Sequence, residues 1–291
     1  MAVNASVSAD KTDHRPHVSE EPVLCVQNLS VGISKRGHGT NILKNVSFSV
    51  NKGEILGLVG ESGSGKSALA KTIVRLESPF DIISGTIRFR DSNLANLKER
   101  ELRKIRGRHI SLVMQNPHKT MDPVFTMGYQ LKEVVRAHEL MEKQPASKKS
   151  LLLSRIHGFL KDVGISSPDL RLSQYPHEWS RGMIQRAQLI MGFSVKPDLL
   201  ILDEVTSALD PTICLQILDI ILRLRKSSRT GIILITHDLS VVREICDRVA
   251  VMKNGEIVET GTLKEVFEKP CHPYTKRLVA AVFEDEGDVG K

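Results

Sequence analysis

The sequence is poor in aromatic residues and cysteines, and it has no long hydrophobic run. Aromatic side chains make up 4% of its 291 residues, so the stacking platforms that bind single-stranded nucleic acid are scarce. Its four cysteines are scattered, without metal-ligand spacing, which argues against a disulfide framework or a zinc site and fits a reducing cytoplasm. No apolar run approaches the roughly 20 residues of a membrane helix, and nothing near the start resembles a signal peptide. We therefore expect a protein that is soluble by itself.

The charge balance is mildly basic. There are 41 Lys and Arg residues against 34 Asp and Glu residues, which gives a net charge of +7. An excess of this size is compatible with nucleic acid, anionic lipid or phosphorylated ligands. The basic residues are dispersed along the chain, which favours a solvated surface over a nucleic-acid patch. We expect no nucleic-acid partner.

Hydrophobic periodicity divides the chain into parts. Residues 1–20 are polar and predict a disordered tail, whereas alternating apolar residues from Val23 onward predict antiparallel strands. A charged segment at about 98–184 carries apolar residues at helical spacing, as expected for an inserted helical region. A polar, acidic tail is expected at 284–291, which leaves a single globular domain over residues 21–283.

Short apolar runs in the rest of the chain predict buried strands. They lie at residues 55–59, 199–202 and 231–235 and are apolar on both faces. Helical patterns at 213–224 and 239–246 alternate with them. This alternation indicates an α/β fold with a parallel sheet.

A glycine-rich stretch follows the first of these strands and matches the phosphate-binding pattern G-x-x-x-x-G-K-[ST]. Glycines let successive backbone N–H groups turn inward around phosphates, at the positive end of the helix that follows. We expect Lys66 to reach the β and γ phosphates of a nucleotide and Ser67 to bind Mg²⁺. The residues assigned to nucleotide binding here are Gly60, Glu61, Ser62, Gly63, Ser64, Gly65, Lys66 and Ser67.

Two adjacent acids, Asp203 and Glu204, follow the strand at 199–202. Ligands bind at the carboxyl ends of the strands in open α/β sheets, so both acids should face the nucleotide. Asp203 is the expected water-mediated partner of Mg²⁺, and Glu204 is expected to orient or deprotonate the attacking water. The glycine-rich loop alone does not separate kinases, GTPases, motor ATPases and transporters.

Three further segments make the resemblance specific. Gln115, within 112–117, resembles the glutamine loop of ATP-binding cassette (ABC) transporter subunits, His237 resembles their switch histidine, and 207–210 resembles the loop that joins two ATPase halves. The resemblance runs from about Val23 to Phe283. It implies a P-loop NTPase (RecA-like) core with an antiparallel β subdomain and an inserted α-helical subdomain, and it implies ATP and Mg²⁺ as cofactors. It assigns Glu204, His237, Lys66 and Gln115 to catalysis and Ser67, Gln115 and Asp203 to Mg²⁺.

The family's signature, usually Leu-Ser-Gly-Gly-Gln, corresponds to residues 179–183, Trp-Ser-Arg-Gly-Met. By resemblance, Ser180 and Gly182 contact the ATP held by a partner ATPase. Arg181 replaces the first glycine, which either blocks a close backbone approach or adds a charge-assisted phosphate contact. We favour the first outcome. Our hypothesis is that the ATP site completed by this signature turns over slowly, while the site at this chain's own loop stays competent.

Two other departures concern single residues. The family usually stacks an aromatic ring on adenine at the position that Ile33 occupies here. Isoleucine has no π-face, so the preference between ATP and GTP stays open. Val205 stands where the family usually has proline, and we attach no functional consequence to it.

Three stretches resemble one branch of the family, the ATPases of binding-protein-dependent importers of di- and oligopeptides and of nickel. They are Gln-Asn-Pro at 115–117 with Met-Asp-Pro at 121–123, Gln-Tyr-Pro-His-Glu at 174–178, and Cys-His-Pro-Tyr-Thr at 271–275. Many such ATPases carry a longer cysteine-containing extension that resembles an iron–sulfur site. Only Cys271 is present there, so we predict no cluster.

The branch implies a peripheral ATPase on the cytoplasmic face of the inner cell membrane. Its partners would be two transmembrane permease subunits, a second ATPase subunit and a periplasmic or extracellular solute-binding protein. Because of Arg181 we favour a different chain as the second ATPase, and we expect the region 115–135 to dock a permease helix. Two alternatives stay open: a soluble ABC ATPase acting on nucleic acid or ribosomes, and a regulatory subunit with one degenerate ATP site. Cargo choice lies outside this sequence.

Overall fold

The structure is a computed structural model that describes residues 22–35, 38–76, 80–141, 148–207 and 209–288. The tail expected at 1–20 lies outside the described residues. Residues 284–288, expected in an acidic tail, instead continue helix α11 (Pro273–Asp288). Extending an existing helix adds one hydrogen bond for each residue fixed, so a polar end can remain helical.

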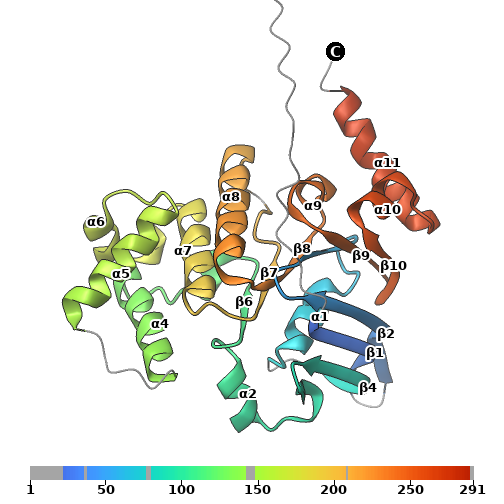
Figure 1. Ribbon diagram of the computed structural model, residues 1–291, viewed down its shortest axis with the longest axis horizontal. Coiled ribbons are helices and arrows are strands. Elements are labelled where there is room, and N and C mark those ends of the chain that lie inside the picture. Colours follow the sequence, from blue (N-terminus) through green and yellow to red (C-terminus); the bar gives the residue numbers. More distant parts are fainter. Residues whose placement is uncertain (1–21, 36–37, 77–79, 142–147, 208, 289–291) are drawn as a thin grey trace, which may run out of the picture.

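A six-stranded sheet forms the centre of the fold, in the order β10-β9-β3-β8-β7-β6 (Figure 1). Every residue of β3, β7 and β8 is buried, which explains why these strands are apolar on both faces. All neighbours pair in parallel except β10, which is antiparallel to β9. The strands are β3 (Ile55–Val59), β6 (Ile110–Val113), β7 (Leu199–Asp203), β8 (Gly231–Thr236), β9 (Arg248–Lys253) and β10 (Glu256–Thr262).

A second sheet is antiparallel and has the order β2-β1-β4-β5. It comprises β1 (Pro22–Lys35), β2 (His38–Asn51), β4 (Phe80–Phe89) and β5 (Ser92–Asn93). Helix α1 (Lys66–Ile73) packs between the two sheets, because its Leu69 and Ile73 share one buried cluster with residues of both. The glycine-rich loop therefore leads into a helix that is held from two sides.

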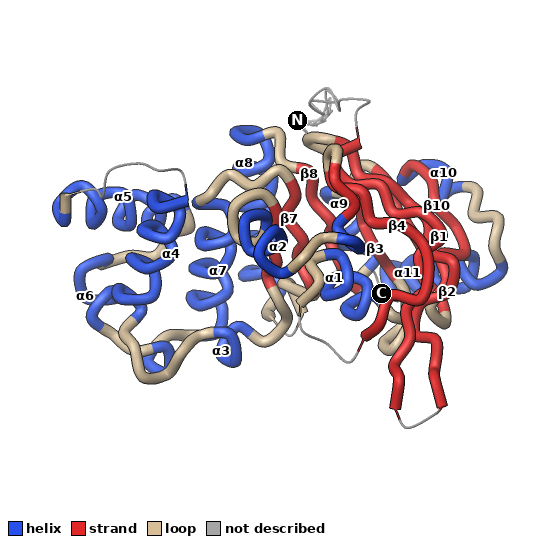
Figure 2. The backbone as a smooth tube through the Cα atoms, turned by 90° about the horizontal axis from the view of Figure 1, so that it is seen from below, coloured by secondary structure: helices blue, strands red, loops and turns tan. Residues whose placement is uncertain are grey.

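The helical subdomain lies to one side of the sheets (Figure 2). It contains α3 (Pro117–Thr120), α4 (Met127–Met141), α5 (Lys149–Asp162), α6 (Pro168–Ser173) and α7 (Arg181–Ser194). The helical segment expected at 98–184 is interrupted, because α2 (Glu99–Ile105) is followed by strand β6 of the central sheet. Pairing with β7 buries Ile110 and Val113, and this long-range pairing overrides the local helical pattern.

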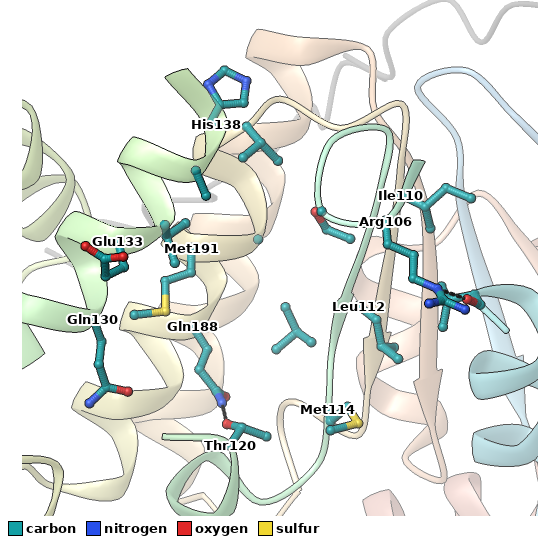
Figure 3. A pocket seen from close by; sticks show the side chains of 18 of the residues that line it. Arg106, Ile110, Leu112, Met114, Thr120, Gln130, Glu133, His138, Gln188 and Met191 are labelled. Carbon is teal, nitrogen blue, oxygen red and sulfur yellow. Dashed lines mark hydrogen bonds between the residues drawn. The ribbon is translucent and has the colours of Figure 1, made fainter. Parts of the chain in front are cut away.

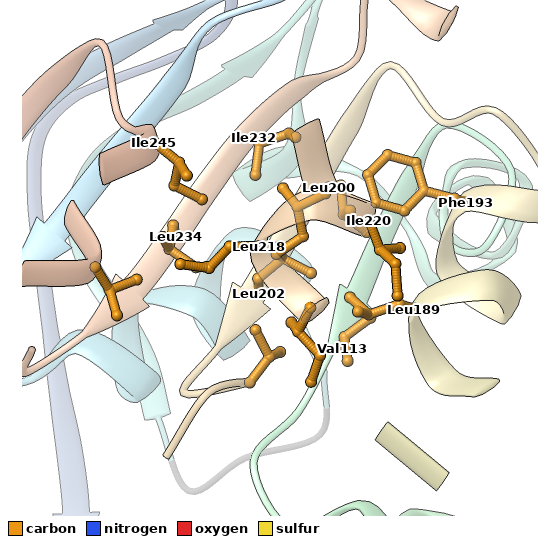
Figure 4. Packing of buried hydrophobic residues seen from close by; sticks show 14 of the residues in the cluster. Val113, Leu189, Phe193, Leu200, Leu202, Leu218, Ile220, Ile232, Leu234 and Ile245 are labelled. Carbon is orange, nitrogen blue, oxygen red and sulfur yellow. The ribbon is translucent and has the colours of Figure 1, made fainter. Parts of the chain in front are cut away.

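One large hydrophobic cluster joins the helical subdomain to the central sheet. Figure 4 shows Leu200 and Leu202 of β7 packed beside residues of α7 and of α8 (Pro211–Ser228). Helix α9 (Leu239–Ile245) packs against β3 and β8 in the middle of the sheet, and α10 (Leu263–Glu268) lies beside the edge strands β9 and β10. No described helix is long and apolar enough to cross a membrane.

A buried ion pair stabilises the end of the sheet that lies opposite the glycine-rich loop. Arg225 of α8 is 4% exposed at its side chain and donates to Asp247 at 2.7 Å and to the Gly53 carbonyl at 2.7 Å. Asp247 also accepts the Ile55 N–H at 2.7 Å. One carboxylate thus ties α8 and the start of β9 to the start of β3.

Asp247→Ala should lower the free energy of unfolding by about 3–5 kcal/mol, because it leaves the buried Arg225 guanidinium without a negatively charged partner. Chemical or thermal denaturation of the purified chain measures this change. The matched control is Asp219→Ala, which removes the exposed partner of Arg223 and should cost only about 0–1 kcal/mol. Equal losses from the two substitutions would contradict the role assigned to the buried pair.

Candidate nucleotide-binding site

The glycine-rich loop connects β3 to α1 in a shape that requires glycine. Gly60 has a φ of +152°, and a Cβ there would lie 2.1 Å from the Met252 carbonyl oxygen of β9. Gly65 has a φ of +108° and caps α1 in the left-handed region. The loop is therefore pressed against the sheet, with the amino end of α1 directed into it.

Lys66 lies inside this loop and is 4% exposed. Its ammonium group donates to the carbonyl oxygens of Gly60 at 2.7 Å and Glu61 at 2.8 Å, and to Ser64 Oγ at 3.2 Å. Burial lowers the pKa of Lys66, while the nearby carboxylates, Glu204 first, oppose that shift. A buried ammonium group at the amino end of a helix suits the β and γ phosphates of a nucleotide.

Ser67 and Asp203 meet at the start of α1 and the end of β7. The Ser67 hydroxyl donates to Asp203 Oδ1 at 3.0 Å. Burial raises the pKa of Asp203, and the hydrogen bond from Ser67 partly offsets this rise. Among the described residues, no three His, Cys, Asp or Glu side chains gather with metal-ligand geometry. A hydroxyl beside one carboxylate nevertheless suits Mg²⁺, which keeps several water and phosphate oxygens as ligands.

Glu204 brings three separate loops together. Gln115 Nε2 donates to Glu204 Oε2 at 2.5 Å, and His237 Nδ1 lies 3.6 Å from Glu204 Oε1. Because β6, β7 and β8 are parallel, the residues that follow them emerge at one edge of the sheet. Glu204 has a φ of +50°, an uncommon conformation for a non-glycine residue that often marks a functional position.

The signature residues lie elsewhere, on the helical subdomain. Ser180 caps α7, because its hydroxyl accepts the Met183 N–H at 3.3 Å. Gly182 packs against α8, where a Cβ would lie 3.0 Å from Ile213 Cγ2. Arg181 occupies the first turn of α7 and donates to Asn116 Oδ1 at 3.3 Å. The unusual arginine is thus linked to the residue that follows Gln115.

One residue at the site was missed by sequence reasoning. Tyr274 belongs to the 271–275 stretch, whose composition alone suggests a surface tyrosine, yet the residue is only 2% exposed. Its hydroxyl accepts the Glu61 N–H of the glycine-rich loop at 3.0 Å. The proline beside it was visible in the sequence, but nothing local indicated this partner.

Two single residues depart from the family pattern. Ile33 lies half-buried on β1, and Val205 is buried in the core.

Comparisons with known proteins identify the family of this chain. The family profile described as ABC transporter matches residues 43–207. The dipeptide transport ATP-binding protein DppD of Bacillus subtilis (strain 168) is 43% identical over 264 residues, which covers 90% of this chain and 77% of that protein. The oligopeptide transport ATP-binding protein OppD of the same organism is 42% identical over 262 residues, with 89% and 72% coverage.

Solved structures confirm the fold class expected from the sequence. The ATP-binding cassette MJ0796, bound to ADP and Pi in a post-hydrolysis dimer, superposes with a TM-score of 0.72 at 23% identity, covering 82% of this chain and 98% of that one. The protein cbiO1 of Clostridium perfringens, part of an ABC transporter complex, gives 0.69 at 26% identity, with 93% and 99% coverage. The chain therefore belongs to the ABC transporter family and is one of its ATP-binding, ATP-hydrolysing subunits.

Proposed function

We propose that this chain powers a binding-protein-dependent importer of peptides or of a related small solute such as nickel. The observation that carries its ATPase role is the meeting of Gln115, Glu204 and His237 beside the loop that encloses Lys66. The peptide branch is supported by the similarity to DppD and OppD over about nine-tenths of the chain. The alternative, a soluble ATPase acting on nucleic acid or ribosomes, has no such support.

The proposed reaction follows from the positions of these groups. Lys66 and the loop N–H groups hold the β and γ phosphates, and Glu204 accepts a proton from the water whose oxygen attacks the γ phosphorus. The bond from that phosphorus to the β–γ bridging oxygen breaks, which releases ADP and phosphate. Gln115 and His237 keep the Glu204 carboxylate in place. Mg²⁺, held by Ser67 and Asp203, would offset the charge that develops on the phosphates.

The proposed membrane partners require a docking surface, and the helical subdomain offers one. A groove of about 640 Å³ lies between β6, α4 and α7, where Met114 and Met191 line it together with Glu133 and Gln130 (Figure 3). Next to it, the rings of Phe125 and Tyr129 stack at 4.6 Å while 42% and 47% exposed. We name Phe125, Tyr129 and this groove the docking surface. Its residues Phe125, Tyr129, Gln130 and Glu133 belong to the expected region 115–135, and the surface suits a short amphipathic helix of a permease.

In this proposal the chain sits on the cytoplasmic face of the inner membrane and binds one of two permease subunits. The second permease would be held by a second ATPase, for which Arg181 favours a different chain. An external solute-binding protein would select the cargo and act through the permeases. The loop that contains Gln115 continues directly into the docking surface. A movement of Gln115 caused by a change at the γ phosphate would therefore displace the residues that contact the permease.

Aspartate at Phe125 or Tyr129 should weaken permease association by about tenfold or more, because aromatic anchors at interfaces often contribute about 2 kcal/mol. Copurification with the coexpressed permeases measures the loss, and ATP binding by the chain should persist. Leu170→Asp, an exposed leucine on α6, is the matched control. If Phe125→Asp and Tyr129→Asp both copurified with the permeases as well as the wild-type chain does, the docking surface would be refuted.

Glu204→Gln should lower the ATPase kcat of the assembled complex by about 10²- to 10⁴-fold, because it removes the proton acceptor but preserves the side-chain shape. ATP binding should remain. Glu268→Gln, at an exposed position on α10, provides the control and should leave the rate unchanged. A Glu204→Gln complex that hydrolyses ATP at the wild-type rate would remove Glu204 from the mechanism.

The signature hypothesis also belongs to this proposal. Arg181 adopts an ordinary helical backbone at the first position of α7. Its side chain lies on the exposed amino end of that helix, where the family presents backbone N–H groups to the partner's ATP. The hydrogen bond to Asn116 keeps the guanidinium group at this surface. We propose that this side chain slows the site completed by the signature.

Arg181→Gly should raise the ATPase rate of the assembled complex toward that of two working sites. Arg181→Ala separates the two explanations, because it removes the charge but keeps a Cβ. If the missing glycine matters, the alanine variant stays as slow as the wild type; if the guanidinium group matters, it matches the glycine variant. An unchanged rate in Arg181→Gly would count against the hypothesis.

A further inference from the structure

One peptide unit of the phosphate loop is hydrogen-bonded at both of its ends. The carbonyl of Gly60 accepts from Lys66 Nζ at 2.7 Å, and the N–H of Glu61 donates to the Tyr274 hydroxyl at 3.0 Å. These two groups belong to the same planar, trans peptide and point in opposite directions. A rotation of this plane would break both bonds, so Tyr274 and Lys66 together define its orientation.

Tyr274 is built into the core at this point. It lies at the start of α11, and the Lys253 ammonium group sits 4.9 Å from the centre of its ring. Burial is the main cause that raises the pKa of Tyr274. The oxygen of its neutral phenol accepts the Glu61 N–H. The Tyr274 hydroxyl therefore provides a fixed hydrogen-bond acceptor for the Glu61 N–H of the loop.

A carboxylate from β10 holds the segment that carries Tyr274. Glu259 accepts the backbone N–H groups of Cys271 at 2.8 Å and His272 at 3.0 Å. His272 Nδ1 in turn accepts the Tyr274 N–H at 3.1 Å. Burial alone would raise the pKa of Glu259, but the hydrogen bonds from the backbone N–H groups of Cys271 and His272 bring it below its ordinary value. We name Glu259 with residues 271–275 the C-terminal brace.

The brace and the β9–β10 turn hold different parts of the loop. Gly255 of the turn donates its N–H to the Ser64 carbonyl at 2.9 Å, and the Met252 carbonyl packs against Gly60. Neither contact engages the Glu61 N–H. Loss of the Tyr274 hydroxyl would leave the loop attached at Ser64 but would free the Gly60–Glu61 peptide to rotate, which would misplace a carbonyl that orients Lys66.

We propose that Tyr274 is a positioning residue for ATP binding: the C-terminal brace fixes the Gly60–Glu61 peptide and thereby the position of Lys66. This inference rests on the ATP-binding function of the loop. It assigns a role to a stretch, 271–275, that the ATPase mechanism does not otherwise use. It also makes nucleotide affinity sensitive to anything that displaces the start of α11.

The test is ATP affinity of the full-length chain, measured with a fluorescent ATP analogue and competing unlabelled ATP. Tyr274→Phe keeps the ring and removes the hydroxyl that bonds Glu61, so the Kd should rise about three- to tenfold. Tyr175→Phe, at an exposed tyrosine remote from the loop, is the matched control and should not change the Kd. Glu259→Gln, which loosens the brace without touching the loop, should raise the Kd by a smaller factor.

A double-mutant cycle with Lys66→Ala distinguishes positioning from general loss of structure. The effect of Tyr274→Phe should largely disappear in the Lys66→Ala background, because the tyrosine acts through the lysine. The proposal would be overturned if both Tyr274→Phe and Glu259→Gln bound ATP with the wild-type Kd. It would also be overturned if Tyr274→Phe changed the Kd by the same factor in the Lys66→Ala background as in the wild-type chain. Failure of the wild-type chain to bind ATP would instead overturn the proposed function.

Discussion

The site depends on one constraint, the burial of the Lys66 ammonium group in a loop pressed against the sheet. Burying a charge is costly unless oxygen atoms and opposite charges surround it. Here the loop carbonyls supply the oxygen atoms, and Glu204, Asp203 and Glu61 supply the negative charge. Gly60 permits the close approach to Met252 that encloses the lysine. The parallel strands then place Gln115, Glu204 and His237 at the same edge.

In the proposed complex, the chain would present two kinds of functional surface to different partners. The edge of the sheet joins Gln115, Glu204 and His237 into one half-site. The amino end of α7 lies on the helical subdomain and contacts α8 and Asn116 instead. This separation agrees with a motor in which each ATP lies between the loop of one subunit and the signature of another. The proposed docking surface beside the Gln115 loop would add the permease to that arrangement.

Sequence reasoning succeeded where a local pattern carried the information. The runs at 55–59, 199–202 and 231–235 became β3, β7 and β8, because continuous apolar residues with turns at both ends have few alternatives to a buried strand. The loop and the acids were then placed by the strands that precede them. The resemblance supplied Gln115 and His237, whose local sequences alone would not have shown that they meet Glu204.

It failed where long-range pairing decides the structure. Residues 110–113 are short and lie in a charged segment, yet pairing with β7, whose partners begin at Leu199, makes them a strand. Tyr274 and Glu61 are 213 positions apart, so no window along the sequence could show that a proline-flanked tyrosine is buried against the phosphate loop. Both cases depend on which segments the fold brings together.

The most direct test of the account is ATP-dependent uptake by the complete complex reconstituted in proteoliposomes with its solute-binding protein. Dipeptides, oligopeptides and Ni²⁺ are offered separately, with wild-type chain or with Lys66→Ala. The account predicts uptake of at least one of these solutes that requires ATP and is lost in the Lys66→Ala complex. Uptake that persists in the variant, or ATP hydrolysis by the wild-type complex without uptake of any of them, would contradict it.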